Sequence, residues 1–558
     1  MERERVATIA KSSAAFIAVF ANEGNGGGSG VVISPDGFAL TNFHVAKPAG
    51  NHMKCGMNDG RLYDAVLVGL DPTGDIALIK LLGRDDFPTA TLGDSDALRV
   101  GDWCFAVGNP FLLATDFQPS VTYGVVSGLH RCQYPAGTLL EYTDAVQTDA
   151  SINPGNSGGP LFSAAGELIG IVGSGSFDKR GRVNVGVGYA ISVNQVKNFL
   201  GCLQAGRLVD HATLGATVST NDAGQVLVNN ILESSDAYRR GLRYGDEIVR
   251  FGERRITSAN GFKSVLGIFP KGWTVPLTYR RQGKETDIQV RLAGLLTPEE
   301  LNDKATKAFG DDKPPSPLPD KPQPDKPKSD KPQPDKPRPD SPEKKQPEVP
   351  AAARPGNSET PAEIAALIDP RPGFANYHFN RLHRDRVWKQ VKQATAALPS
   401  GEWLVAGKQS GGAMLEMSLG DETSSGKFAT GNVTLDAADD IDTQLGPADS
   451  GGLVATLHLL RLLLSEGPDK FGEVFYYGLK PIELGSEQYD VLIATRNVAE
   501  LHLWTERESG ALVRAELFVD SDSDPCELRF TPESTEVWHA GKLFATLDPI
   551  AAKREAKQ

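Results

Sequence analysis

The chain has 558 residues, a formal net charge of -13 and a pI near 5.3. Its length is several times that of a typical domain, so we expect two to four independently folded units. The excess of acidic residues argues against a general nucleic-acid-binding role, because neutralising phosphates requires a basic surface. The hydrophobic fraction of 40% and the charged fraction of 23% are ordinary for a globular protein.

The sequence indicates neither a disulfide framework nor a membrane span. Five cysteines are few, odd in number and scattered, and no Cys-x-x-Cys pair suggests a metal or redox motif. The longest apolar run, Leu453–Leu464, is shorter than the roughly 18 residues that a spanning helix needs. It carries His458 and Arg461 and predicts a packed amphipathic helix. No export signal is visible at the start of the chain, and we expect no cofactor and no metal.

From about residue 10 to residue 200, short apolar runs alternate with turn residues. Val31–Ile33 and Phe38–Leu40, for example, flank the turn Ser34-Pro35-Asp36-Gly37. Such regularly spaced short strands predict a β-barrel or sandwich. Residues 212–295 carry further strand-like runs with helix-compatible stretches between them, which predicts a second compact α+β unit.

The segment Asp311–Pro350 contains 14 prolines in 40 positions and equal numbers of acidic and basic residues, so it cannot bury a core and predicts a disordered spacer. After it the composition becomes globular again, with a predicted helix over Arg381–Ala397 and a predicted antiparallel sheet. The strands expected there are Ala413–Leu419, Lys427–Leu435, Glu473–Leu479, Asp490–Ala494, Glu500–Thr505, Ala511–Val519 and Glu536–Phe544. The predicted units are therefore residues 1–207, 208–297, a flexible linker over 298–358, and an α+β domain over 359–558.

A serine in a glycine-bracketed loop is the first sign of chemistry. The segment Pro154-Gly155-Asn156-Ser157-Gly158-Gly159 can aim backbone amides at one point, because glycine tolerates unusual dihedral angles. An acyl-transfer enzyme needs such donors for the oxyanion of its tetrahedral intermediate. We assign Gly155, Asn156 and Ser157 to this oxyanion hole and Ser157 to the role of nucleophile.

A serine hydroxyl is a poor nucleophile unless a histidine, oriented by a carboxylate, takes its proton. His44 follows a predicted hairpin, where the end of a strand can present it at a cleft. Asp75 precedes the apolar run Ile76-Ala77-Leu78-Ile79, where its carboxylate can be held partly buried. The sequence thus predicts a triad of His44, Asp75 and Ser157.

Three segments resemble the catalytic blocks of the HtrA/Deg serine proteases, in the same order: GSGVVISPDGFALTNFHV, DPTGDIALIKL and QTDASINPGNSGGPL. The resemblance covers about residues 15–295 and implies a trypsin-like double β-barrel and an ATP-independent endopeptidase for unfolded or damaged proteins. It also implies a primary specificity pocket at Ser151, Ile171 and Gly173 that does not require basic side chains. An alternative on the same fold is a catalytically silent chaperone or peptide-binding scaffold.

The segment Arg240-Gly241-Leu242-Arg243-Tyr244-Gly245-Asp246 resembles a turn of protease-associated PDZ domains, although Tyr244 stands where a proline is usual. The resemblance implies that amides near Leu214, Gly215 and Ala216 capture the C-terminal carboxylate of a peptide.

The HtrA/Deg resemblance further implies a homotrimer or larger assembly and a periplasmic or otherwise extracytoplasmic location, while a cytoplasmic one stays open. The C-terminal domain faintly resembles the half-barrel sheets of LolA-like lipoprotein carriers, and a sheet that only packs on itself is the favoured interpretation.

Overall fold

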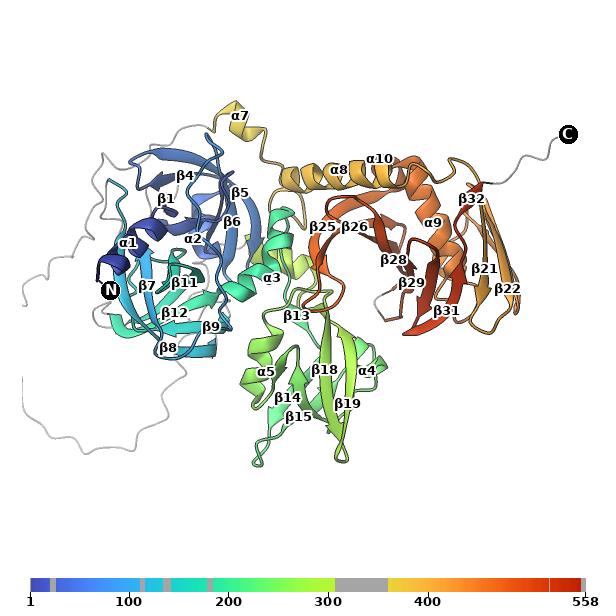
Figure 1. Cartoon of the computed structure of the whole chain (residues 1–558), viewed down its shortest axis with the longest axis horizontal. Coiled ribbons are helices and arrows are strands. Elements are labelled where there is room, and N and C mark those ends of the chain that lie inside the picture. Colours follow the sequence, from blue (N-terminus) through green and yellow to red (C-terminus); the bar gives the residue numbers. More distant parts are fainter. Residues whose placement is uncertain are drawn as a thin grey trace, which may run out of the picture.

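A computed structural model describes residues 2–20, 27–110, 116–133, 142–177, 184–306, 360–520 and 522–552 of the protein. In Figure 1, two β-barrels lie at one end of the molecule and a large curved sheet at the other. A smaller unit lies below and between them, and helix α8 runs across the top. Within the described residues, no helix is both long and apolar enough to span a bilayer.

The first unit consists of two closed six-stranded barrels with strand orders β1-β2-β3-β6-β5-β4 and β10-β11-β12-β9-β8-β7, which confirms the predicted double barrel. Closure leaves no exposed sheet edge. Helix α1 precedes the first barrel, α2 follows β3 in the chain, and α3 follows the second barrel. The bounds are α1 Glu2–Ser13, β1 Phe16–Phe20, β2 Gly27–Val32, β3 Phe38–Thr41, α2 Phe43–Ala49, β4 His52–Met57, β5 Leu62–Asp71, β6 Ile76–Leu81, β7 Trp103–Gly108, β8 Ser120–Gln133, β9 Tyr142–Thr148, β10 Pro160–Ser163, β11 Leu168–Phe177, β12 Asn184–Ser192 and α3 Val193–Gln204.

In several barrel strands, such as β1 and β6, side chains on both faces are buried, which explains why their apolar runs are continuous. In β6, Ala77 and Ile79 point into one core cluster, while Ile76 and Leu78 point into another that reaches α3 and the second barrel. Alternate residues of a strand face opposite sides. The barrels therefore share one packed interface, and the segments carrying the predicted site end beside it.

The middle unit is an antiparallel sheet in the order β14-β15-β16-β18-β19, with β17 paired to β16 and helices α4 and α5 beside it. Phe251, Phe262 and Trp273 are among the buried residues of its own core. Its elements are β13 Ala212–Thr213, β14 Ala216–Thr220, β15 Val226–Ile231, α4 Asp236–Arg239, β16 Glu247–Phe251, β17 Arg254–Arg255, α5 Ala259–Leu266, β18 Thr274–Arg281, β19 Lys284–Arg291 and β20 Ala293–Gly294.

The segment predicted as a linker over residues 298–358 begins with a helix, α6 Pro298–Thr306. Leu301 and Ala305 of α6 join the core of the first barrel, and Lys47 Nζ donates to the Ala305 carbonyl at 2.5 Å. The helix forms because two apolar residues one turn apart can be buried against that barrel. The rest of the predicted linker, from residue 307 to residue 358, lies outside the described residues.

The C-terminal domain is built on a twelve-stranded antiparallel sheet in the order β24-β23-β22-β21-β31-β30-β29-β28-β27-β26-β25, with β32 paired to β21. The predicted sheet-rich α+β class is confirmed. Its elements are α7 Ala362–Ala365, α8 Tyr377–Ala394, β21 Trp403–Gln409, β22 Met414–Leu419, β23 Thr423–Phe428, β24 Gly431–Asp436, the 3₁₀ turn Ile441–Thr443, α9 Leu453–Glu466, α10 Pro468–Phe471, β25 Glu473–Pro481, β26 Gln488–Arg496, β27 Ala499–Thr505, β28 Leu512–Phe518, β29 Cys526–Phe530, β30 Thr535–His539, β31 Lys542–Leu547 and β32 Ala551–Ala552.

Three sequence predictions for this domain differ from the structure. The runs Lys427–Leu435 and Glu536–Phe544 each span a hairpin, β23–β24 and β30–β31, and not one strand. The second hairpin turns at Ala540 and Gly541, which both have positive φ, and only the glycine gives a sequence signal. Helix α9 is buried on nearly all sides, His458 and Arg461 included, and is not amphipathic.

The C-terminal domain is docked directly on the double barrel. Asn380 of α8 is fully buried, and its amide donates to the carbonyls of Ala205 and Tyr476 at 2.8 and 2.7 Å. Gly201 of α3 and Gly478 of β25 pass so closely that a side chain at Gly478 would collide with the Gly201 carbonyl. These contacts join the end of the barrels to the edge of the large sheet.

Candidate active site

His44 and Asp75 are brought together by the first barrel. His44 is the second residue of α2, directly after β3, and Asp75 lies in the turn between β5 and β6. The His44 Nδ1 is 3.0 Å from Oδ1 and 2.8 Å from Oδ2 of Asp75. The His44 backbone N–H also donates to Oδ1 at 3.0 Å. This contact leaves Nε2 of the imidazole available on the other side of the ring.

The surroundings of Asp75 hold it in an uncommon conformation. Its φ is +61°, a left-handed value that is rare for residues other than glycine. The Asp75 carbonyl accepts hydrogen bonds from the Asn42 side chain at 2.9 Å and from the Phe43 N–H at 3.2 Å. The hydroxyl of Tyr142, from β9 of the second barrel, donates to Oδ2 at 2.9 Å. Asp75 is fully buried, so the His44 backbone N–H and the Tyr142 hydroxyl replace water around its carboxylate.

The charge of Asp75 sets the protonation of its neighbours. Burial alone would lower the pKa of His44, but the Asp75 charge and its hydrogen bonds together outweigh burial and raise that pKa. Burial, helped by the nearby carboxylate, raises the pKa of Tyr142 far above its usual range, so its hydroxyl stays a donor. The pair is therefore arranged to stabilise an imidazolium when His44 takes a proton.

Ser157 lies in the loop between β9 and β10, at the interface of the two barrels. Its carbonyl accepts from the Ser29 N–H at 2.8 Å, and Gly28 has no room for a side chain, because a Cβ there would lie 2.8 Å from the same carbonyl. In the described part of the chain, the Ser157 hydroxyl donates to the Gly173 carbonyl at 3.3 Å and makes no hydrogen bond to His44. The hydroxyl would have to rotate to reach an imidazole acceptor.

The loop before Ser157 contains a glycine with a positive φ. Gly155 has φ +103°, and its carbonyl is held on the inner side by the Ser29 hydroxyl at 2.7 Å. Among the described residues, the amides of Gly155 and Ser157 make no hydrogen bond, whereas the Asn156 amide donates to the Asn153 carbonyl at 3.0 Å. Of the three predicted oxyanion donors, Gly155 and Ser157 are thus available and Asn156 is engaged within the loop.

The three residues predicted for a specificity pocket have different environments. Ser151 is exposed, and its carbonyl accepts from the Thr122 hydroxyl at 3.0 Å. Ile171 is 1% exposed and belongs to the barrel core. Gly173 packs against the ring of Tyr142, where a Cβ would be 2.6 Å from a ring carbon. Ser151 can therefore border a bound peptide, whereas Ile171 and Gly173 are buried in the structure.

The residues predicted to hold a peptide carboxylate lie where the middle unit begins. Leu214 is buried in the core, Gly215 has φ +71°, and Ala216 starts β14, the edge strand of this sheet within the described residues. The Gly215 amide donates to the Thr213 hydroxyl at 3.2 Å. An exposed strand edge offers backbone groups to an added strand.

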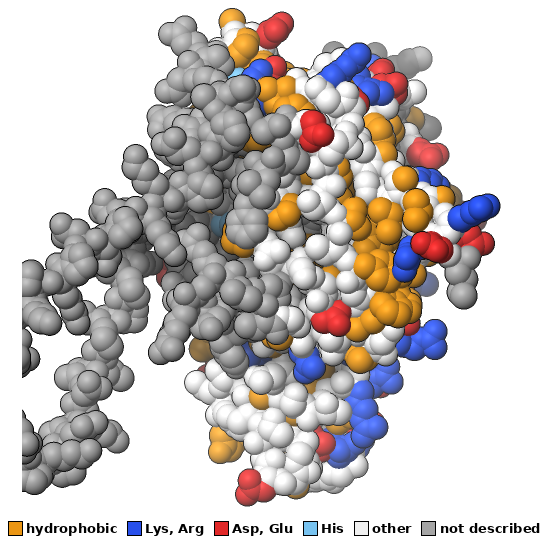
Figure 2. Space-filling view, turned by 90° about the vertical axis from the view of Figure 1, so that its left-hand side faces the viewer, with side chains coloured by type: hydrophobic (Ala, Val, Ile, Leu, Met, Phe, Trp, Pro, Cys, Tyr) orange, Lys and Arg blue, Asp and Glu red, His pale blue; other side chains and the backbone are white. Residues whose placement is uncertain are grey.

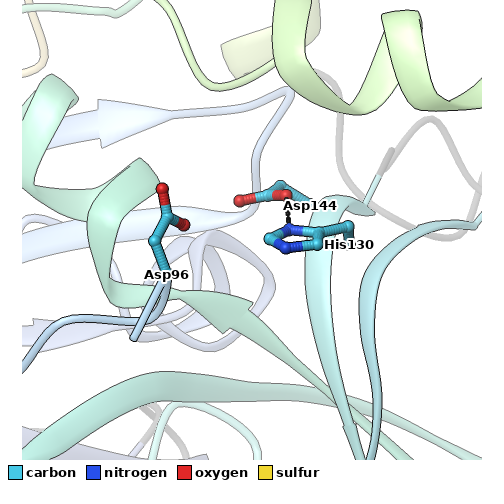
Figure 3. Close-up of side chains that lie close together, drawn as sticks. All are labelled: Asp96, His130 and Asp144. Carbon is cyan, nitrogen blue, oxygen red and sulfur yellow. Dashed lines mark hydrogen bonds and ion pairs between the residues drawn. The ribbon is translucent and has the colours of Figure 1, made fainter. Parts of the chain in front are cut away.

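Asp96, His130 and Asp144 are the three residues in the described ranges that could hold a metal ion, and Figure 3 shows their side chains close together. The guanidinium of Arg254, from β17, occupies this position. It lies 2.5 Å from Asp144 Oδ1, 2.6 Å from Asp96 Oδ1 and 3.2 Å from His130 Nδ1. The cluster is therefore an ionic contact between the barrels and the middle unit.

Tyr142 and Ser29 are the functional candidates that sequence reasoning missed. Tyr142 opens an ordinary strand, and no local pattern indicates that its hydroxyl reaches a residue 67 positions away. Ser29 stands inside a Gly-Ser-Gly run, and no local pattern indicates that its hydroxyl reaches the Gly155 carbonyl. Both roles depend on contacts across the barrel interface.

Comparison with known families agrees with this geometry. Residues 28–171 match the model of the trypsin-like peptidase domain, and residues 212–292 match that of the PDZ domain. The chain thus carries a trypsin-like peptidase domain followed by a PDZ domain, as predicted.

The first half of the chain is related to DegP and HtrA-type serine proteases. It is 35% identical over 286 residues to a probable periplasmic serine endoprotease, DegP-like, of Chlamydia trachomatis, covering 48% of this chain and 54% of that protein. It is 37% identical over 290 residues to the periplasmic serine endoprotease DegP of Escherichia coli K12, covering 48% and 59%. The chain spans little more than half the length of these relatives. A solved structure of the HtrA-type protease AlgW with a tripeptide is 30% identical, with a TM-score of 0.43, and covers 53% of this chain and 98% of that one.

Proposed function

We propose that the protein is an ATP-independent serine endopeptidase that hydrolyses peptide bonds of unfolded or damaged proteins through His44, Asp75 and Ser157. The observation that carries the proposal is the buried Asp75 carboxylate, 2.8 Å from His44 Nδ1, beside a Ser157 loop in which the amides of Gly155 and Ser157 make no hydrogen bond to any described residue. The substrate class rests on the likeness to DegP and HtrA-type proteases.

The proposed reaction begins when the Ser157 hydroxyl turns from the Gly173 carbonyl to His44 Nε2. The serine oxygen attacks the substrate carbonyl carbon while Nε2 takes the hydroxyl proton, and Asp75 stabilises the imidazolium. The amides of Gly155 and Ser157 donate to the oxyanion, and removing one such donor typically costs about 3 kcal/mol of barrier. His44 then protonates the leaving amine, and water hydrolyses the acyl-enzyme by the reverse sequence.

Incubation with unfolded casein tests this proposal. We expect the wild type to release fragments and to react with a fluorophosphonate probe, whereas Ser157→Ala should do neither. Equal fragment release by both proteins would refute the mechanism. The two proteins differ by one hydroxyl at a partly buried site, so their thermal unfolding should agree closely.

The second candidate function is a silent chaperone or peptide-binding scaffold on the same fold. The observation in its favour is the Ser157 hydroxyl bound to Gly173 and not to His44. This function predicts that suppression of substrate aggregation survives in Ser157→Ala and that the wild type is not labelled by the probe.

We further propose that peptides with a free C-terminus bind the PDZ domain by adding a strand to β14, with the carboxylate at Leu214, Gly215 and Ala216. Support comes from the open edge of β14 and the left-handed Gly215. A labelled peptide should lose affinity when its carboxylate is amidated. Equal affinity of both forms would contradict carboxylate capture.

We also propose that the peptidase domains assemble as a homotrimer or larger oligomer. Trp103 and Tyr123 stack with their ring centroids 5.2 Å apart, and Trp103 is 56% exposed. Figure 2 views the molecule from the side of the barrels and shows hydrophobic side chains gathered on part of that face. Exposed apolar patches commonly mark interaction sites. Light scattering that reports a monomer would exclude this assembly.

The proposed location is the periplasm, because the names of the relatives describe periplasmic enzymes. Fractionation of the producing cells tests it, since recovery of the protein with cytoplasmic markers alone would contradict the proposal.

A further inference from the structure

A second histidine–aspartate pair is buried near the triad. His211 Nε2 lies 3.0 and 2.9 Å from the two carboxylate oxygens of Asp71. His211 is 3% exposed and Asp71 is fully buried. Burying an ionisable pair is costly unless its geometry and hydrogen bonds are good. Neither residue belongs to the triad, so the pair needs an explanation of its own.

Asp71 holds the turn that presents Asp75. It is the last residue of β5, and its Oδ1 accepts the N–H groups of Thr73 at 3.1 Å and Gly74 at 2.7 Å. Gly74 has no space for a side chain, because a Cβ would lie 2.3 Å from Asp71 Oδ2 and 3.0 Å from His211 Nε2. The next residue is Asp75, with its left-handed φ. The main chain leading to Asp75 is therefore fixed to the Asp71 carboxylate.

His211 fixes that carboxylate in turn. Its ring stacks on Phe199 of α3, with centroids 4.4 Å apart and planes 27° apart. Since the Nε2 contacts both oxygens of Asp71, the imidazole prevents the carboxylate from turning away from the two backbone amides. His211 itself belongs to the segment that joins α3 to β13 of the PDZ domain.

Three further charged side chains lie near the His211–Asp71 pair. Asp210 lies next to His211, and its carboxylate accepts the Leu296 N–H. Lys271 is close to Asp210, since both border the position of Gly294. Lys304 of α6 donates to the Thr73 hydroxyl at 3.0 Å. Burial opposes charge on His211, but Asp71 and, more weakly, Asp210 outweigh it and raise the pKa of the imidazole.

We propose that His211 and Asp71 are positioning residues for the reaction assigned to Ser157: they lock the 72–75 turn so that the Asp75 carboxylate stays on His44. The inference rests on the proposed function. Conformations such as that of Asp75 persist only when the surroundings enforce them. Once the lock is removed, Asp75 can relax toward an ordinary φ, which moves its carboxylate away from His44 Nδ1.

Two substitutions of His211 distinguish its ring contact with Phe199 from its hydrogen bond to Asp71. His211→Phe keeps a ring against Phe199 but removes both nitrogens, whereas His211→Gln keeps one donor for Asp71. The matched control is Asp490→Asn in the C-terminal domain, which weakens the ion pair of the buried Asp490 carboxylate with the partly exposed Arg386 side chain, far along the chain from the triad. Thermal unfolding establishes that each variant is folded at the assay temperature.

We expect His211→Phe to lower kcat for a peptide substrate roughly 10- to 100-fold with little change in KM, because the displaced group acts in the transition state. His211→Gln should recover most of the loss, and Asp490→Asn should match the wild type. In His211→Phe the acid limb of kcat/KM should move to lower pH, because His44 loses part of the carboxylate interaction that raises its pKa. A loss of stability alone would not move that limb.

A measurement independent of turnover separates this inference from the proposed function. NMR titration of ring-labelled histidines should show a lower pKa for His44 in His211→Phe than in the wild type. An unchanged His44 titration and unchanged kcat in the folded variant would overturn the positioning role. If His211→Phe is unfolded, the same readouts on His211→Leu decide, because that variant also removes both ring nitrogens from Asp71. A wild type that neither cleaves nor labels would refute the proposed function, whereas the titration would still report on the lock.

Discussion

Replacing Tyr142 by Phe removes one hydroxyl that donates to Asp75 Oδ2 at 2.9 Å. The ring can stay against Gly173, so the change is confined to the carboxylate. Asp75 keeps its contacts with the Nδ1 and backbone N–H of His44 but loses its donor from the second barrel. The carboxylate then presents more negative charge to the imidazole, which raises the pKa of His44 further.

The energy of one hydrogen bond limits the expected rise in the pKa of His44. A hydrogen bond to a charged group contributes about 1.5–3 kcal/mol to stability, and one pKa unit corresponds to about 1.4 kcal/mol. Only the part of the interaction that differs between neutral and charged His44 shifts its pKa, so we expect a rise of about one unit or less. Because His44 must be neutral to accept a proton, kcat/KM on the acid limb should fall up to roughly tenfold, with little change on the plateau.

The assay is the pH profile of kcat/KM for a peptide substrate. Tyr63→Phe is the matched control, since it also removes a tyrosine hydroxyl from an aspartate, Asp59 at 2.7 Å, but leaves Asp75 untouched. We expect the acid limb of Tyr142→Phe alone to move to higher pH. A limb that stays in place or moves to lower pH would refute the assigned role of the hydroxyl.

Two further predictions concern stability. Arg254→Met should lower the free energy of unfolding by about 3 kcal/mol in urea titrations, because it removes the guanidinium that pairs with the buried Asp144 carboxylate. Burial opposes ionisation of Asp144, but His130 and Arg254 lower its pKa below the usual 3.8. The stabilisation is therefore present above that value, is lost as pH falls through the folded pKa, and should largely disappear in Arg254→Met. The pKa of His211 is raised, so its pairing with Asp71 should stabilise the fold fully below pH 6.5 and less as pH rises through the pKa of the folded state. In His211→Gln, the free energy of unfolding should therefore fall less steeply with rising pH than in the wild type. An equal fall in both proteins would contradict the pairing.

Much of the double barrel and of the candidate site follows from local signals. Gly155 and Gly158 predict a loop with positive φ, and in the structure their φ values are +103° and +84°. The apolar run after Asp75 predicts a strand, which is β6. Such features can be inferred because the residues concerned are neighbours in the chain.

The C-terminal domain was harder to predict because its turns carry weak signals and its docking carries none. The β30–β31 turn depends on Ala540 in a left-handed conformation that alanine does not favour. Asn380 stands one residue before the predicted helix Arg381–Ala397, yet it lies within α8 and is buried between Ala205 and Tyr476. Whether such an amide faces water or two distant carbonyls depends on how the domains pack.

By itself, the sequence determined the short strands of a barrel or sandwich, a second compact unit and the segments that carry His44, Asp75 and Ser157, since short-range patterns of glycine, turn residues and apolar runs specify them. The resemblance to HtrA/Deg proteases and to PDZ domains added the double barrel and the PDZ-like unit. Only the tertiary structure decided that Tyr142 donates to Asp75 and that His211 clamps the turn before it. Those contacts join side chains 67 and 140 positions apart. Contacts at such separations arise from packing between barrels and domains, and a local pattern contains no information about which distant group will fill a given space.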